Sequence, residues 1–143
     1  MRHPKNHSTA SAVLILAAGL GKRMKSSLPK VLHDVCGEPM LVALLRSIRE
    51  AAPDASIGII VGHGRDEVEA AVRGSDVSHG LKINFLLQAE QKGTGHAVRS
   101  AMVTEWGRER RNESSPILVL PGDSPLIPAS LIEAMLRPYE PKE

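Results

Sequence analysis

Residues 12–24 read Ala-Val-Leu-Ile-Leu-Ala-Ala-Gly-Leu-Gly-Lys-Arg-Met, an apolar run that stops abruptly in a glycine-rich loop. The run over 12–17 is short and continuous, which is typical of a fully buried strand. Small residues and glycines after a strand let the backbone come close to a ligand, so that N–H groups can point at phosphate oxygens. Lys22, Arg23 and Lys30 then offer positive charge. The stretch therefore predicts a phosphate-binding loop at the end of a buried strand.

The loop matches neither of the two commonest phosphate-binding motifs. A P-loop has Ser or Thr after its Gly-Lys pair, and here Gly21-Lys22 is followed by Arg23. A dinucleotide fingerprint has a third glycine, and Met24 stands in its place. Because a glycine-rich turn alone is weak support for phosphate contact, the rest of the chain has to decide.

Composition favours one domain with an aliphatic core. Of the 143 residues, 42% are apolar and 2% aromatic, which suits a parallel sheet of Val, Ile and Leu. A net charge of +2 and scarce aromatic side chains argue against nucleic-acid binding. No apolar run is long enough to cross a membrane, so no membrane partner is expected. Cys36, as the single cysteine, excludes an internal disulfide and favours a cytoplasmic location.

Apolar runs alternate with helical stripes along the chain. Strands are expected over 12–17, 56–61, 81–88 and 117–120, and helices from Pro39 to just before Pro53, over 66–72, from a Thr94 cap to about Trp106, and over 129–136. This alternation predicts right-handed βαβ crossovers and an α/β fold, a Rossmann-like, doubly wound and mainly parallel sheet.

The remaining segments are assigned from their polarity. The charged stretch 105–115 is interpreted as a surface loop, and residues 1–11 as a disordered leader. Residues 12–137 would form the nucleotide-binding part of the domain, and 138–143 a tail.

Two further segments are expected at the carboxyl edge of the sheet, where such folds bind ligands. In the segment 88–97, Gln88 offers a donor and an acceptor, and Gly93 to Gly95 lead into a helix start that suits an anion or a polar edge. His96 falls in the first helical turn and is interpreted as a packed or surface histidine.

The segment 120–126 has two interpretations. Pro121-Gly122 suits the centre of a type II turn, in which Asp123 is an ordinary turn residue. Asp123 could instead hold Mg²⁺, which takes one or two carboxylates together with phosphate oxygens. The residues alone leave both interpretations open.

In this order the segments resemble sugar-nucleotide pyrophosphorylases, and specifically the uridylyltransferase domain of the bacterial bifunctional enzyme (N-acetylglucosamine-1-phosphate uridyltransferase and glucosamine-1-phosphate acetyltransferase) that makes UDP-N-acetylglucosamine. The resemblance runs from Val13 to about Leu136 and implies a fold of the nucleotide-diphospho-sugar transferase type. The matching motifs are Leu16-Ala-Ala-Gly-x-Gly-x-Arg-Met24, Pro29-Lys-Val-Leu-His33, Gln88-Ala-Glu-Gln-x-Gly-Thr-Gly-His-Ala97 and Gly122-Asp-x-Pro-Leu126.

The resemblance implies roles for single residues. Arg23 and Lys30 would be catalytic, and Asp123 would bind Mg²⁺. The implied nucleotide-binding residues are Leu16, Ala17, Ala18, Gly19, Gly21, Lys30, Gln88, Gly93, Thr94, Pro121 and Gly122. Among them, Gln88, Gly93 and Thr94 would read uracil, and Pro121 and Gly122 would lie by the nucleotide sugar.

The implied reaction joins UTP and N-acetylglucosamine-1-phosphate to give UDP-N-acetylglucosamine and pyrophosphate, in the synthesis of peptidoglycan and lipopolysaccharide precursors. The alternatives are another nucleotidyltransferase, such as a molybdenum-cofactor guanylyltransferase, or a non-catalytic nucleotide-binding module. In the family the catalytic domain continues to a sugar pocket and a second metal ligand, and a trimer-forming β-helix follows. We therefore expect a truncated fold with poor activity, and self-association or marginal stability through an uncovered strand edge.

Overall fold

A four-stranded parallel sheet forms the centre of the computed structural model, which describes residues 11–19, 26–113 and 116–137. Its strands are β1 (Ala12–Leu16), β4 (Ser56–Val61), β5 (Lys82–Leu87) and β6 (Ile117–Pro121), in the order β5-β4-β1-β6. In the register, Ile15 of β1 lies beside Ile59 of β4 and Leu120 of β6. The predicted parallel sheet is confirmed.

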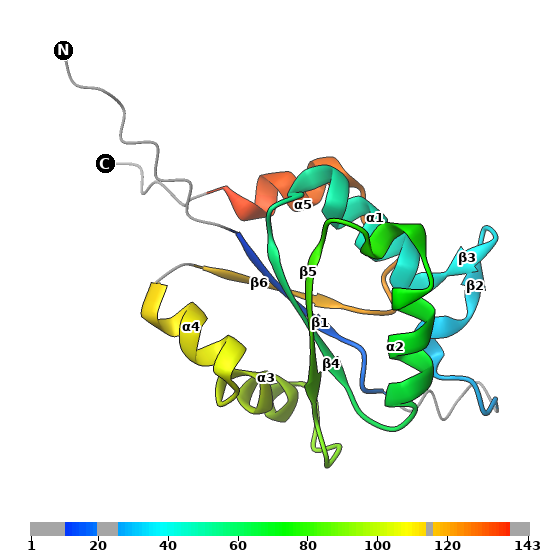
Figure 1. Cartoon of the computed structure of the whole chain (residues 1–143), viewed down its shortest axis with the longest axis horizontal. Coiled ribbons are helices and arrows are strands. Elements are labelled where there is room, and N and C mark those ends of the chain that lie inside the picture. Colours follow the sequence, from blue (N-terminus) through cyan, green and yellow to red (C-terminus); the bar gives the residue numbers. More distant parts are fainter. Residues whose placement is uncertain (1–10, 20–25, 114–115, 138–143) are drawn as a thin grey trace.

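Helices cover both faces of the sheet (Figure 1). One apolar cluster joins the sheet to α1 (Met40–Ala51), α2 (Arg65–Arg73) and α5 (Ala129–Leu136). A second cluster on the opposite face includes residues of α3 (Thr94–Met102) and α4 (Glu105–Glu113). Alternate residues of β1 belong to the two clusters, because successive side chains of a strand point to opposite faces. The predicted doubly wound α/β architecture is confirmed.

The order of the strands reverses between β1 and β6. The chain runs outward from β1 through β4 to β5, and then returns to the far side of β1 as β6. The ends of β1 and β6 are held together, since the N–H of Gly122 donates to the carbonyl of Leu16 over 2.8 Å. A Cβ on residue 122 would lie 2.9 Å from that carbonyl oxygen, so only glycine allows this approach. Ligands of open α/β sheets bind at such a switch point.

The predicted surface loop over 105–115 is wrong for residues 105–113, and its last two residues lie outside the described ranges. Residues Glu105–Glu113 form helix α4, whose sequence is almost entirely polar. Trp106 anchors it: the ring is 5% exposed, and its Nε1–H donates to the hydroxyl of Ser56 in β4 over 2.9 Å. A lone aromatic residue gives no apolar periodicity, and for this reason the sequence pattern hid the helix.

Two predicted turn details are also wrong. Thr94 does not cap α3; the N-cap is Gly93, at φ 91°, and no side chain caps the helix. After β6, the N–H of Ser124 donates to the carbonyl of Pro121, so the turn is centred on Gly122 and Asp123 rather than on Pro121 and Gly122. Pro121 is held in the strand by its pairing with Leu16, which moves the turn along by one residue.

A small hairpin between β1 and α1 was not predicted. It pairs β2 (Asp34–Val35) with β3 (Glu38–Pro39) and follows the 3₁₀ turn η2 (Lys30–Leu32). A second 3₁₀ turn, η3 (Asp76–Ser78), lies against α1. Strands of two residues are too short to show an alternating pattern, so the sequence carries little sign of them.

Arg46 on α1 joins these two small elements. Its guanidinium lies 2.9 Å from Glu38 of β3 and 3.1 Å from Asp76 of η3. The hydrogen bonds from Arg46 hold the pKa of Asp76 below its usual value of 3.8. The same bonds raise the pKa of Arg46.

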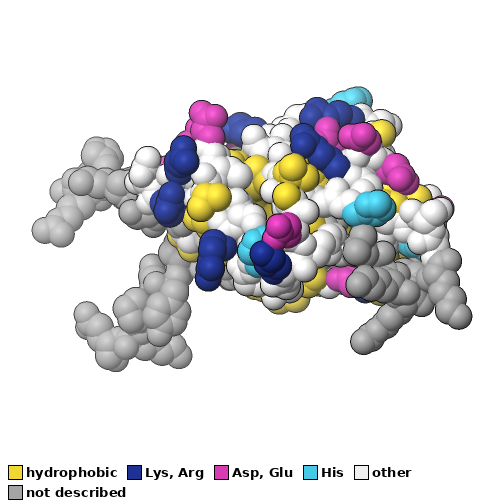
Figure 2. Space-filling view, turned by 90° about the horizontal axis from the view of Figure 1, so that it is seen from below, with side chains coloured by type: hydrophobic (Ala, Val, Ile, Leu, Met, Phe, Trp, Pro, Cys, Tyr) yellow, Lys and Arg dark blue, Asp and Glu magenta, His cyan; other side chains and the backbone are white. Residues whose placement is uncertain are grey.

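The surface carries both signs of charge. Figure 2 shows basic and acidic side chains interspersed over the face seen from below, with no broad basic field. None of the helices in the described ranges is both long and apolar enough to cross a membrane. The predicted leader, apart from Ser11, and the predicted tail over 138–143 lie outside the described residues.

Candidate functional site

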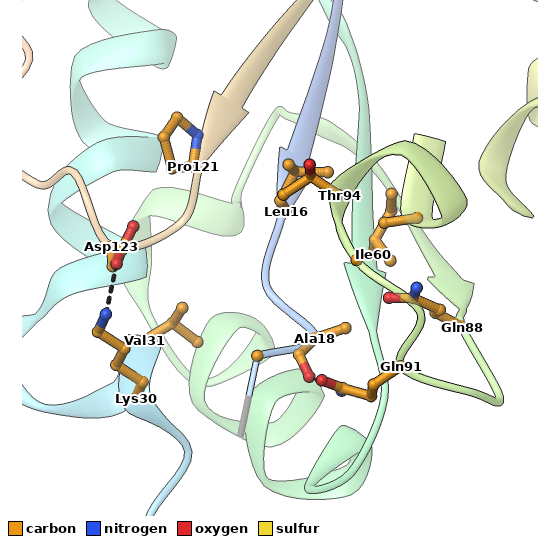
Figure 3. A pocket seen from close by; sticks show the side chains of 13 residues that line it. Leu16, Ala18, Lys30, Val31, Ile60, Gln88, Gln91, Thr94, Pro121 and Asp123 are labelled. Atoms are coloured by element: carbon orange, nitrogen blue, oxygen red, sulfur yellow. Dashed lines mark hydrogen bonds and ion pairs between the residues drawn. The ribbon is translucent and has the colours of Figure 1, made fainter. Parts of the chain in front are cut away.

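A cavity of about 520 Å³ lies beside the β1–β6 switch point, at the carboxyl edge of the sheet (Figure 3). It draws on all three segments singled out in the sequence, which are separated by up to a hundred residues. Its lining residues are Leu16, Ala18, Gly19, Lys30, Val31, Ile60, Gln88, Gln91, Gly93, Thr94, Ala97, Pro121 and Asp123.

The loop after β1 gives the cavity Leu16, Ala18 and Gly19. Between them Ala17 turns the other way, into the apolar cluster under α1, and its N–H donates to the carbonyl of Ile60. This alternation continues the strand pattern past its last paired residue. Gly21 and Arg23, both predicted to meet the nucleotide, lie outside the described residues.

The segment after β5 supplies two amide side chains. Gln88 is 4% exposed, and its N–H continues the strand ladder by donating to the carbonyl of Val61. The Nε2 atom of Gln88 lies 2.9 Å from Nδ1 of His96. Gln91 donates from its own Nε2 to the carbonyl of Ala18, so it ties this segment to the loop after β1.

The segment after β6 gives the cavity Pro121 and Asp123. The carboxylate of Asp123 forms an ion pair with Lys30 of η2, with 2.7 Å between Oδ2 and Nζ. The two side chains are 37% and 41% exposed, so both remain open to solvent and to a ligand. In Figure 3 this pair lies on one side of the pocket and Gln88 on the other.

Two predicted nucleotide-binding residues do not line the cavity. Ala17 faces the core, and Gly122 is buried where β6 approaches β1. Both support the cavity wall from behind, and their contact with a nucleotide stays a prediction.

Four lining residues were not predicted. Val31, Ile60 and Ala97 are apolar, and an apolar wall residue cannot be told from a core residue in the sequence. Gln91 could have been found, because it stands inside the motif over 88–97 between two residues that were assigned.

The donor set suits one kind of metal site. Among the described residues, Asp123 is the single carboxylate that lines the cavity, and no group of three or more His, Cys, Asp or Glu is placed to bind a metal. One carboxylate is a weak site by itself, but Mg²⁺ is commonly held by one or two carboxylates plus the phosphates of a substrate. Asp123 therefore fits a metal ion that arrives with a phosphorylated ligand.

The cavity has charged side chains on one side and a carboxamide on the other. Lys30 and Asp123 can meet phosphate groups and their metal ion, since a lysine ammonium is a compact charge for phosphate. Gln88 presents a buried carboxamide that can pair with the edge of a base. Apolar side chains such as Val31 and Ile60 lie between, as in most small-molecule sites.

Comparisons with known proteins agree with this description. The family model of the MobA-like NTP transferase domain matches residues 13–143. The bifunctional protein GlmU of Burkholderia multivorans is 44% identical over 124 residues, which are 87% of this chain and 24% of that protein. The chain thus spans about a quarter of the length of this curated relative.

Solved structures share the fold. HddC of Yersinia pseudotuberculosis, complexed with GMP-PN, is 26% identical, with a TM-score of 0.62 over 88% of this chain and 54% of that one. Rv0371c of Mycobacterium tuberculosis, in complex with manganese, has a TM-score of 0.59 at 20% identity, over 89% of this chain and 58% of its own.

Proposed function

The chain belongs to the family of MobA-like NTP transferase domains, and we propose that it is the UTP-binding part of an N-acetylglucosamine-1-phosphate uridylyltransferase. The family makes it a nucleotidyltransferase domain, homologous to the uridyltransferase region of GlmU. The observation that carries the proposal is the placement of Lys30 with Asp123 and of Gln88 on opposite sides of one cavity.

The proposed reaction forms a bond from a phosphate oxygen of the sugar phosphate to the α-phosphorus of UTP, and breaks the bond from that phosphorus to the pyrophosphate oxygen. Positioning and charge neutralisation dominate phosphoryl-type transfer, because the protein has little covalent chemistry to do. Lys30 would neutralise charge on the leaving pyrophosphate, and Arg23 is proposed to act with it. Gln88, Gly93 and Thr94 would hold the uracil.

A divalent cation, proposed to be Mg²⁺, would be held by Asp123 and the phosphates of the nucleotide, where it neutralises negative charge. The donor chemistry at Asp123 supports this, and the manganese complex of a protein with the same fold agrees with a divalent metal. Lys30 is paired with Asp123, so its ammonium would have to turn toward a phosphate oxygen for Asp123 to hold the metal.

Guanine nucleotides are a second candidate, because HddC, a protein of the same fold, was solved with GMP-PN. The 44% identity to GlmU favours uridine over guanosine. The substrates UTP, N-acetylglucosamine-1-phosphate, UDP-N-acetylglucosamine and pyrophosphate, and a cytoplasmic location, belong to the proposal.

Calorimetric titration of the chain with UTP and with GTP, each with and without Mg²⁺, tests the proposal. We expect UTP to bind more tightly than GTP and Mg²⁺ to strengthen UTP binding. In Asp123→Asn the gain from Mg²⁺ should fall by at least about tenfold, because a charged ligand atom is lost. Asp54→Asn, at an exposed carboxylate after α1, is the matched control and should behave as wild type.

Tighter binding of GTP than of UTP would contradict the uridylyl assignment. An undiminished effect of Mg²⁺ in Asp123→Asn would contradict the role of Asp123.

A further inference from the structure

The bond between Gln88 and His96 is a feature of the cavity wall that nucleotide binding alone does not explain. Gln88 ends β5, and its backbone is fixed by the bond to Val61. His96 lies in the first turn of α3, so the bond joins the strand to the helix that follows it. The side chain of Gln88 is nine-tenths buried or more, at 4% exposure.

The chemistry of the two groups fixes the direction of this bond. The amide nitrogen Nε2 has hydrogens to give and no acceptor orbital, so Nδ1 of His96 accepts through its lone pair. The imidazole is then neutral, with its proton on the other ring nitrogen. A carboxamide held through its nitrogen cannot turn over, and its oxygen must point the other way.

The oxygen of Gln88 is available to a ligand. Within the described ranges, no group of the chain donates a hydrogen bond to Oε1. Oε1 is also not one of the fully buried polar atoms that lack a partner, so part of its surface is accessible. Gln88 lines the cavity, and in Figure 3 its carboxamide is turned toward Ile60 and Ala18. Oε1 is therefore reachable from the cavity, and its lone pairs can accept a hydrogen bond from a donor on a ligand bound there.

We propose that His96 is a positioning residue that holds Gln88 with its acceptor oxygen toward the base. The inference rests on the proposed function and deepens it. Uracil carries an N–H at ring position 3, which can donate to Oε1. Cytosine carries a lone pair at that position, which would face the lone pairs of Oε1. The hydrogen bond between His96 and Gln88 therefore makes the pocket select a pyrimidine with an imino N–H over a pyrimidine without one.

Removal of the hydrogen bond between His96 and Gln88 should reduce the preference for uracil over cytosine. A free carboxamide can turn by half a rotation and offer its N–H instead of its oxygen, so it can serve either pyrimidine. One hydrogen bond gained or lost corresponds to about a tenfold change in binding. The ratio of UTP to CTP affinity is thus the quantity that His96 controls.

Three variants of the full chain, titrated with UTP and with CTP, test the proposal. His96→Phe keeps a planar aromatic ring and removes the acceptor; we expect the UTP-to-CTP affinity ratio to fall by about tenfold. His96→Asn offers an oxygen near the place of Nδ1, and should keep the ratio within about threefold of wild type. His79→Phe, at an exposed histidine after η3, is the matched control and should leave the ratio unchanged.

An unchanged ratio in His96→Phe, or an equal loss of both affinities in His96→Phe and His96→Asn, would overturn the proposal, since a merely structural histidine would behave in this way. Side-chain amide spectra give a test that needs no nucleotide. One Nε2 proton of Gln88 should be shifted by its bond to the ring in wild type and His96→Asn, and should lose that shift in His96→Phe.

The two proposals can fail separately. A wild-type chain that binds neither nucleotide contradicts the proposed function. The amide spectra then test on their own whether His96 holds the carboxamide of Gln88. Identical Gln88 spectra in wild type and His96→Phe would overturn this role of His96. Tight binding of UTP with no preference over CTP would leave the proposed nucleotide site intact and overturn the selection by His96.

Discussion

At the scale of single residues, Lys30 and Asp123 are joined by an ion pair at the cavity wall. Their ion pair is about 40% exposed, and pairs of this kind contribute about 0.2–1 kcal/mol to stability. A charge-assisted bond to a phosphate is worth more, about 1.5–3 kcal/mol. The pair can therefore open for a ligand at small cost, which suits a binding site better than a structural link.

This comparison gives a prediction for Lys30→Gln. The variant should lose UTP affinity by at least about tenfold, because the bond to phosphate is lost. Its free energy of unfolding should change by less than about 1 kcal/mol, because an exposed ion pair contributes little. Calorimetry and urea unfolding measure the two effects, with Lys82→Gln, an exposed lysine at the start of β5, as the matched control. A large loss of stability with unchanged UTP affinity would make the pair structural.

At the scale of elements, α4 shows how a helix can depend on two residues. Trp106 lies against the sheet, where Gly58 of β4 leaves room for its ring. Gly107 follows at the corner between α3 and α4, where a Cβ would overlap the carbonyl oxygen of Ala101. The helix packs tightly at this corner although most of its residues are polar.

Gly107→Ala should therefore destabilise the chain. The added methyl group meets backbone rather than a flexible side chain, and overpacking of this kind costs about 1–3 kcal/mol. Urea unfolding measures the loss. Gly95→Ala in the first turn of α3 is the control: its Cβ would meet nothing within 4 Å, so alanine should be neutral or stabilising there. Equal stability of wild type and Gly107→Ala would mean that α4 does not pack as described.

The ion pairs of Arg46 with Glu38 and Asp76 predict how the stability of the chain depends on pH. The bonds from Arg46 lower the pKa of Asp76 in the folded chain below its usual 3.8, so the folded chain binds this proton less readily than the unfolded chain. The stabilisation is present above the usual pKa and is lost as the pH falls through the folded value. The gap in unfolding free energy between wild type and Arg46→Gln should thus shrink from neutral pH to about pH 3.

Urea unfolding across this range checks the prediction, with Arg108→Gln, at an exposed arginine of α4, as the control for loss of charge. A gap between wild type and Arg46→Gln that stays constant down to acid pH would contradict the link.

The elements also show where sequence patterns are sufficient. Strand β4 and helix α5 match their predicted ranges, because the continuous apolar run of β4 reflects burial on both faces of the sheet and the apolar stripe of α5 reflects one buried face. Helix α4 and the β2–β3 hairpin were missed, because tertiary contacts rather than local periodicity form them. The carboxyl edge could be predicted from strand order, but the bond of Gln88 to His96 could not, because it depends on the packing of α3 against β5.

At the scale of the whole molecule, β6 is an edge strand of the sheet that the described residues form. β6 pairs with β1 on one side, and no described strand pairs with its other side. Val119 on β6 is 40% exposed, and Leu131 and Met135 on α5 are similarly exposed, four residues apart on one helix face. Open edges and exposed apolar side chains favour association between chains.

We therefore expect sedimentation velocity to show a mass that rises with protein concentration. Val119→Lys should weaken this association, because a charged side chain on an edge strand opposes pairing. Val103→Lys, at an exposed valine after α3, is the matched control and should leave the association unchanged. A wild-type chain that stays strictly monomeric at high concentration would contradict the expectation.

The account depends on three distant segments meeting in one nucleotide site, and backbone amide spectra during titration with UTP and Mg²⁺ test this most directly. We predict that the amides of Ala18 and Gly19, of Gly93 and Thr94, and of Gly122 and Asp123 shift together with a single affinity. Shifts confined to one of these segments, or centred on η3 and α5 away from the cavity, would contradict the account.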